Sequence, residues 1–157
     1  MTMGLINVNL ITLFKMTKLF LKKMIERDYG RIMNIGSTGA FMPCPLNAVY
    51  VATKAFVLHM SEGISEELAK TNNVSVSTLC PGATVTEFAN KANLEKSLLF
   101  RFFTMKASVV AQIGFEGMMK KKRIIIPGLY NKMISFSYRL FPRALITKIG
   151  MQLMKSY

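Results

Sequence analysis

Residues 34–37 read Asn-Ile-Gly-Ser, and residues 48–54 read Ala-Val-Tyr-Val-Ala-Thr-Lys. The first segment ends an apolar run that is typical of a β-strand, and the second opens a stretch with helical periodicity. On a helix Tyr50 and Lys54 are four residues apart and therefore share one face. Ser37, thirteen residues before Tyr50 at the end of the strand, can reach the same place. The sequence thus predicts that a hydroxyl, a phenol and an ammonium group converge.

These three groups favour acid–base chemistry. A free tyrosine has a pKa of about 10, and a neighbouring ammonium group stabilises the phenolate, so we expect Lys54 to lower the pKa of Tyr50. Ser37 can donate a hydrogen bond to a substrate carbonyl and hold it against the phenol. Reduction of a carbonyl to an alcohol needs such a proton donor together with a hydride from a cofactor.

The offset of Ser37 and the Tyr50-x-x-x-Lys54 pair resemble the active-site signature of the short-chain dehydrogenase/reductase family. Two further segments extend the resemblance, which covers about residues 5–130. Residues 79–86, Leu-Cys-Pro-Gly-Ala-Thr-Val-Thr, are similar to the family's Pro-Gly-x-x-x-Thr segment. Upstream, residues 7–9, Asn-Val-Asn, stand where the family has a catalytic asparagine on a helix.

The resemblance implies a role for each matching residue. Tyr50 would be the acid/base, Lys54 would lower its pKa and bind the nicotinamide ribose, and Ser37 would orient the carbonyl. Asn9, which the offset to Ser37 favours over its rival Asn7, would distort its helix and hold a water in a proton relay to the lysine. The implied cofactor-binding residues are Tyr50, Lys54, Pro81, Gly82, Thr84 and Thr86.

The implied fold is α/β: the second half of a Rossmann-like, doubly wound parallel sheet, over residues 1–130. The family's first half begins with a strand and a Gly-x-x-x-Gly-x-Gly turn that binds the pyrophosphate, and the sequence contains no such turn. We therefore expect a truncated reading of a longer gene, with a piece of a split protein or an inactive remnant as alternatives. The implied cofactor is NADP or NAD, and the choice stays open because the discriminating part is absent.

Apolar periodicity and helix-breaking residues predict the other elements. Helices are expected over residues 1–25, 47–70 and 108–119, and strands over residues 31–36, 74–79 and 123–126. We expect Gly30 to adopt the left-handed conformation that follows a helix end, and the strand over 31–36 to be buried and parallel. Residues 89–103 are apolar and basic where the family has a variable substrate-covering segment, which favours a hydrophobic substrate or a subunit contact.

The net charge of +13 is concentrated in the C-terminal part of the chain. Residues 101–157 hold eleven Lys or Arg against one acid, Glu116. We expect residues 131–157 to be a basic amphipathic helical tail that could pack as an extra helix or lie on an anionic membrane. A solvated basic face is the ordinary explanation of such charge. Nucleic-acid binding is not predicted, because no recognition motif accompanies the charge.

No apolar run reaches the roughly 18 residues of a membrane span, since four lysines between residues 15 and 23 interrupt the best candidate. Cys44 and Cys80 have no metal-ligand spacing, and no metal site is expected. These features predict a cytoplasmic protein with at most a peripheral membrane contact.

Together the patterns predict an NAD(P)-dependent oxidoreductase that interconverts a carbonyl and an alcohol on a hydrophobic small molecule. The expected protein partners are further copies of the chain or the missing N-terminal half. The alternative is a catalytically inactive remnant that acts as a membrane-surface or subunit-interaction module.

Overall fold

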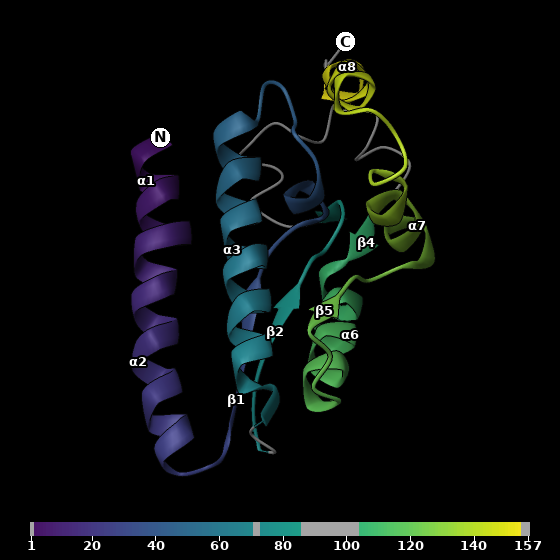
Figure 1. The fold of residues 1–157 in the computed structure, drawn as a ribbon. Helices are drawn as coiled ribbons and strands as arrows, with labels where there is room; N and C mark the ends of the chain where they lie inside the picture. Colours follow the sequence, from purple (N-terminus) through teal and green to yellow (C-terminus); the bar gives the residue numbers. More distant parts are fainter. Residues whose placement is uncertain (1, 71–72, 86–103, 155–157) are drawn as a thin grey trace.

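The computed structural model describes residues 2–70, 73–85 and 104–154. Three parallel strands, β1 (Gly30–Ile35), β2 (Val74–Leu79) and β5 (Ile124–Ile125), form a sheet in the order β1-β2-β5. The helices α2 (Leu13–Glu26) and α3 (Ala48–Glu67) pack on one face, and α6 (Ala107–Met119) packs on the other (Figure 1). The predicted α/β fold with a parallel, doubly wound sheet is confirmed.

Short helical turns, a second parallel sheet and two C-terminal helices complete the described chain. They are α1 (Thr2–Ile6), the π-helical turn η1 (Asn7–Thr12), the 3-10 turns η2 (Thr38–Phe41) and η3 (Leu68–Lys70), β3 (Thr84–Val85) paired with β4 (Met105–Lys106), α7 (Leu129–Ser137) and α8 (Arg143–Met154). The sequence did not predict β3 and β4, because two residues are too few to show periodicity. The C-terminal tail contains two helices, and Pro142 directly precedes the second.

Strand β2 is the centre of the core, and all six of its residues are buried. Val76 packs beneath α2 and α3, whereas Leu79 packs beneath α6 together with Val110 and Ile125. Alternate residues of a strand point to opposite faces of the sheet, so β2 supplies both halves of the core. The predicted boundaries of this strand, 74–79, are confirmed.

The left-handed residue after the first long helix is Asp28, with φ 47°, and not Gly30 as predicted. Gly30 is instead the first residue of β1, and a Cβ added there would collide with the side chain of Met24. The glycine is therefore needed for the close approach of strand and helix.

Strand β1 is less buried than predicted. Only Gly30 and Asn34 are buried, and Ile35 is 44% exposed. Among the described residues β1 pairs with β2 alone, so its other edge carries no strand. A parallel strand becomes buried on both sides only when neighbours flank it.

The N-terminal helix corrects a third expectation. By length and composition alone, the helix from Met3 to Glu26 is long and apolar enough to cross a membrane. The lysines are too widely spaced to exclude an 18-residue window with at most two charged residues. A soluble core helix or a signal sequence passes the same test, so this property does not place the helix in a membrane.

Candidate active site

The segments that follow β1 and β2 meet at the carboxyl end of the sheet. The amide of Gly36 donates to the carbonyl of Leu79 at 2.7 Å, and the amide of Thr38 donates to the carbonyl of Pro81 at 2.9 Å. These two bonds hold the segment around Ser37 against the Pro81-Gly82 turn. In parallel α/β sheets this edge is where ligands bind.

Ser37 lies in extended backbone immediately before the turn η2. Its Oγ accepts a hydrogen bond from the amide of Gly39 at 3.1 Å, which caps the turn. The same side chain forms a hydrogen bond with the phenol of Tyr50. Ser37 thus serves as a turn cap and also contacts the tyrosine predicted to work with it.

Tyr50 lies in the first turn of α3, and its pKa is raised, opposite to the sequence-based expectation. Burial is the main cause, because desolvation penalises the phenolate, and the hydrogen bond with Ser37 lowers the pKa in part. The Nζ atom of Lys54 lies 5.8 Å from the centroid of the Tyr50 ring. In this arrangement the loss of hydration outweighs the nearby positive charge.

Lys54 lies one turn further along α3 and reaches back to the sheet. Its Nζ donates to the carbonyl of Ile35, the last residue of β1, at 2.9 Å. Burial lowers the pKa of Lys54, and an electrostatic interaction with the neighbouring Cys80 opposes that shift. The lysine therefore joins the helix to the strand end that leads to Ser37.

Asn9 lies in the π-helical turn η1, which is a distortion of the kind that the family resemblance implies at this residue. Its Nδ2 donates to Oγ1 of Thr53 at 2.9 Å, and that hydroxyl donates to the carbonyl of Tyr50 at 2.7 Å. Asn7, the rival candidate, is exposed. Asn9 is thus connected to the segment of α3 that holds Tyr50 and Lys54.

Two polar residues near the site had no predicted role. Thr53 accepts a hydrogen bond from the side chain of Asn9. Asn34, on β1, links the two helices α2 and α3. The Asn34 Oδ1 accepts from Thr17 on α2 at 3.4 Å, and its Nδ2 donates to Ser61 on α3 at 2.9 Å. A polar residue inside an apolar strand is a signal for such a link, because buried polar groups need partners.

The implied cofactor-binding residues after β2 are present in part. Thr84 Oγ1 donates to the carbonyl of Gly82 at 3.0 Å, which closes the turn after Pro81. A Cβ added at Gly82 would collide with Asn131 of α7, so this turn packs tightly against the C-terminal region. Thr86 lies outside the described residues.

The donor groups at this edge suit the nicotinamide half of a dinucleotide. A lysine ammonium and a tyrosine hydroxyl on one helix face are hydrogen-bonding partners for the hydroxyls of a ribose. The described residues contain no glycine-rich turn between a strand and a helix that could hold a pyrophosphate. The site therefore fits one end of the cofactor.

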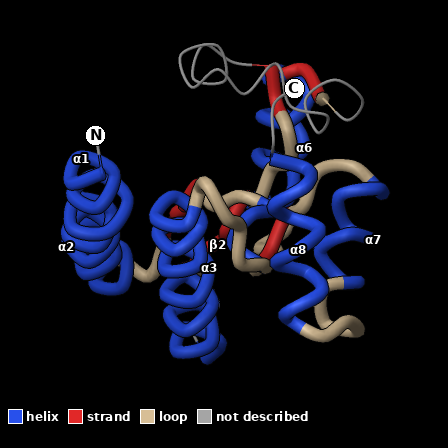
Figure 2. Tube along the Cα trace, turned by 90° about the horizontal axis from the view of Figure 1, so that it is seen from above, coloured by secondary structure: helices blue, strands red, loops and turns tan. Residues whose placement is uncertain are grey.

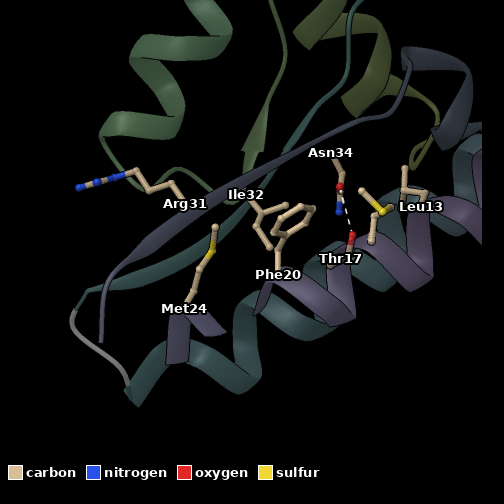
Figure 3. A pocket seen from close by; sticks show the side chains of 8 residues that line it. Leu13, Thr17, Phe20, Met24, Arg31, Ile32 and Asn34 are labelled. Atoms are coloured by element: carbon tan, nitrogen blue, oxygen red, sulfur yellow. Dashed lines mark hydrogen bonds between the residues drawn. The ribbon is translucent and has the colours of Figure 1, made fainter. Parts of the chain in front are cut away.

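A separate pocket lies between α2 and the free edge of β1. Its volume is about 360 Å³, and its lining residues are Leu13, Met16, Thr17, Phe20, Met24, Arg31, Ile32 and Asn34. Figure 3 shows Thr17 and Asn34 joined by their hydrogen bond between the helix and the strand. None of Ser37, Tyr50 and Lys54 lines this pocket.

Comparison with known proteins gives concordant results. The very-long-chain 3-oxoacyl-CoA reductase of Mus musculus is 32% identical over 154 residues, which cover 97% of this chain and 46% of that protein. A short-chain dehydrogenase from Sphingobium yanoikuyae, solved in complex with NADPH, is 26% identical with a TM-score of 0.69 over 86% of this chain and 54% of that one. A 7β-hydroxysteroid dehydrogenase structure, at 23% identity and a TM-score of 0.77, shares the fold over 92% of this chain and 56% of that one.

The chain spans about half the length of the curated relatives it matches. The short chain dehydrogenase family model matches residues 2–97, which include Asn9, Ser37, Tyr50, Lys54 and the Pro81-Gly82 turn. On this match, the chain belongs to the short-chain dehydrogenase family.

Proposed function

We propose that the chain carries the proton-transfer and nicotinamide-binding part of an NAD(P)-dependent oxidoreductase that interconverts a carbonyl and an alcohol. One observation carries the proposal: Ser37, at the end of β1, is hydrogen-bonded to Tyr50 on α3, and Lys54 joins that helix to the same strand end. A hydroxyl, a phenol and an ammonium group thereby converge at the ligand-binding edge of the sheet.

In this proposal Tyr50 donates a proton to the carbonyl oxygen during reduction and accepts it during oxidation. Burial favours the protonated phenol, which is the form that reduction requires. Ser37 donates a hydrogen bond to the same oxygen and orients it. A bound nicotinamide supplies or accepts the hydride.

Lys54 would bind the nicotinamide ribose, and Pro81, Gly82 and Thr84, together with Thr86, would surround the nicotinamide. Asn9 would hold the relay water beside Lys54; its bond to Thr53, the residue before the lysine, supports this placement. The NADPH complex of the Sphingobium relative supports a dinucleotide of this class. The adenine and pyrophosphate would be held by a glycine-rich half of the fold, or by further copies of the chain.

We propose a hydrophobic carbonyl compound as substrate. Curated relatives from mouse, human and zebrafish are named very-long-chain 3-oxoacyl-CoA reductases. Residues 89–103, which follow the Pro81-Gly82 turn, include six leucines and phenylalanines among basic residues. A long acyl chain attached to an anionic carrier would suit both the apolar and the basic side chains of this segment.

The test is titration of the purified chain with NADH and NADPH, followed by nicotinamide fluorescence. Lys54→Ala removes the ribose-binding group, and Lys70→Ala, an exposed lysine at the far end of the same helical segment, is the matched control. Each protein is measured alone and with the separately produced glycine-rich half of a family member. We expect Lys54→Ala to lose binding and Lys70→Ala to retain it.

The proposal is overturned if the folded chain binds neither NADH nor NADPH, both alone and together with the glycine-rich half. Equal binding by Lys54→Ala and the unaltered chain would refute the role of the lysine. A screen of 3-oxoacyl thioesters of increasing chain length, with Tyr50→Phe as the inactive control, would then test the substrate class.

A further inference from the structure

Helix α7 presents several large apolar side chains to solvent. Leu129, Met133, Phe136 and Leu140 follow one another at intervals of four, three and four residues, which places them on one helical face. Their exposed fractions are 74%, 63%, 61% and 69%. Hydrogen bonds from the amides of residues 138, 139 and 140 to preceding carbonyls continue the helical path as far as Leu140. We call these four residues the α7 stripe.

The opposite side of α7, which contacts the protein, carries the half-buried Ile134 and Tyr138 beside small and polar residues. Ser135 is buried, and Asn131 donates to the carbonyl of Pro127 at 2.7 Å and packs against Gly82. A surface helix of a globular protein ordinarily turns its apolar stripe toward the core, whereas α7 also turns four large apolar side chains toward solvent. The outward stripe of α7 therefore has no explanation in the packing of the described chain.

Basic residues border the stripe, and acids are absent from this part of the sequence. Lys132 is three residues from Leu129 and four from Phe136, and Arg139 is three residues from Phe136; both are exposed. Residues 117–157 contain nine Lys or Arg and no Asp or Glu. In Figure 2, α7 lies at the outer edge of the molecule, on the side away from α1 and α2. The stripe is thus accessible to a large flat surface.

We propose that the α7 stripe docks on an anionic lipid bilayer. The apolar side chains would enter the boundary between headgroups and acyl chains, and Lys132 and Arg139 would lie among the lipid phosphates. A second copy of the chain would bring two strongly positive faces together, which charge repulsion disfavours. A nucleic acid would attract the charge but would leave the apolar stripe without a partner.

The chain contains no tryptophan, so a single introduced tryptophan reports on one position. In Phe136→Trp the new indole should shift its emission to the blue and become protected from quenching when phosphatidylglycerol-containing vesicles are added. Phe14→Trp, at an exposed phenylalanine of α2, is the matched control and should show neither change. Vesicles of phosphatidylcholine alone should give a much weaker response.

Vesicle flotation, without an introduced tryptophan, tests how much the stripe and its basic neighbours contribute to vesicle binding. Met133→Ser with Phe136→Ser should weaken binding at least roughly ten-fold, because two large apolar side chains are lost. Met16→Ser with Phe14→Ser, the same pair of residue types on α2, should change it by less than about two-fold. Lys132→Gln and Arg139→Gln should each weaken binding about five-fold at low salt.

Circular dichroism of each variant separates lost docking from lost folding. The proposal fails if folded chain does not bind the anionic vesicles, or if the α2 pair abolishes binding while the α7 pair does not. It also fails if Met133→Ser with Phe136→Ser dissolves a dimer seen by ultracentrifugation, since the stripe would then be a contact between copies. The proposal would likewise be refuted if the indole of Phe136→Trp responded more strongly to RNA than to the anionic vesicles.

Discussion

At the level of single residues, Tyr50 is surrounded by groups with opposite effects on its pKa. Burial raises the pKa, and the hydrogen bond with Ser37 lowers it. Lys54 is itself desolvated, which lowers its pKa because burial destabilises the charged ammonium form. The phenol is consequently protonated at neutral pH in the free protein. In the proposed reduction, the phenol is then already in the form that donates a proton before substrate binds.

Ser37→Ala should raise the pKa of Tyr50 further, because the variant removes the group that stabilises the phenolate. Burial already places the titration midpoint of Tyr50 above the value of about 10 for a free tyrosine. Alcohol oxidation, which needs the phenolate, should rise with pH through that midpoint, whereas carbonyl reduction should fall through it. Tyrosinate absorbance, taken as the difference between each protein and its Tyr50→Phe derivative, measures the midpoint without requiring activity.

Ser65→Ala, on the same helix, controls for the loss of a hydroxyl and should leave the midpoint unchanged. A midpoint below that of free tyrosine would contradict this account. It would show that the charge of Lys54 dominates over burial, as the sequence alone suggested.

At the level of secondary-structure elements, the site depends on how two helices and one strand are held together. The side chain of Asn9 joins the N-terminal helix to α3 through Thr53, and Lys54 joins α3 to β1. The π-helical turn places Asn9 toward α3 and leaves Asn7 exposed. These links determine where the phenol and the ammonium lie relative to Ser37.

Asn9→Ala should reduce the free energy of unfolding by about 0.5–1.5 kcal/mol, because one interhelical hydrogen bond is lost. Asn7→Ala, two residues away in the same turn and exposed, should change it by less than about 0.5 kcal/mol. Denaturant unfolding measures both. The effects of Asn9→Ala and Thr53→Val should be less than additive, since both remove the same bond. Strict additivity would show that the two side chains do not interact.

At the level of the whole molecule, β1 is an edge strand of the described sheet. The amides of Gly30 and Gly36 donate toward the β2 side, so the alternation of a parallel strand directs the amides of Arg31, Met33 and Ile35 to the other edge. The pocket between α2 and β1 adjoins that edge. An open edge of this kind is a template for a further strand.

Hydrogen exchange should distinguish the two edges of β1. The amides of Arg31, Met33 and Ile35 should exchange faster than those of Ile32 and Asn34, which face β2, and faster than all of β2. Amide-resolved exchange by NMR measures this pattern. Equal protection along β1 would mean that the edge is paired, and dilution would then show whether a second copy pairs with it. Addition of the glycine-rich half of a family member should slow the three edge amides selectively.

Much of this architecture could be predicted from local patterns. Strand 74–79, the helix around Tyr50 and the helix that begins near residue 107 each have enough periodic apolar residues to be recognised. The meeting of Ser37 with Tyr50 followed from their spacing and from the position of parallel strand ends. By contrast, the strands β3 and β4, the left-handed Asp28 and the break before α8 depend on one or two residues each, which carry too little pattern.

The sequence by itself determined the fold class, the order of the main elements and the hydroxyl, phenol and ammonium groups that meet at the site. These properties follow from residue type and spacing along the chain. Only the tertiary structure decided the direction of the Tyr50 pKa shift, the partner of Asn9, the role of Asn34 and the outward stripe of α7. The physical reason is that desolvation, hydrogen bonding between distant segments and exposure all depend on which parts of the chain pack together.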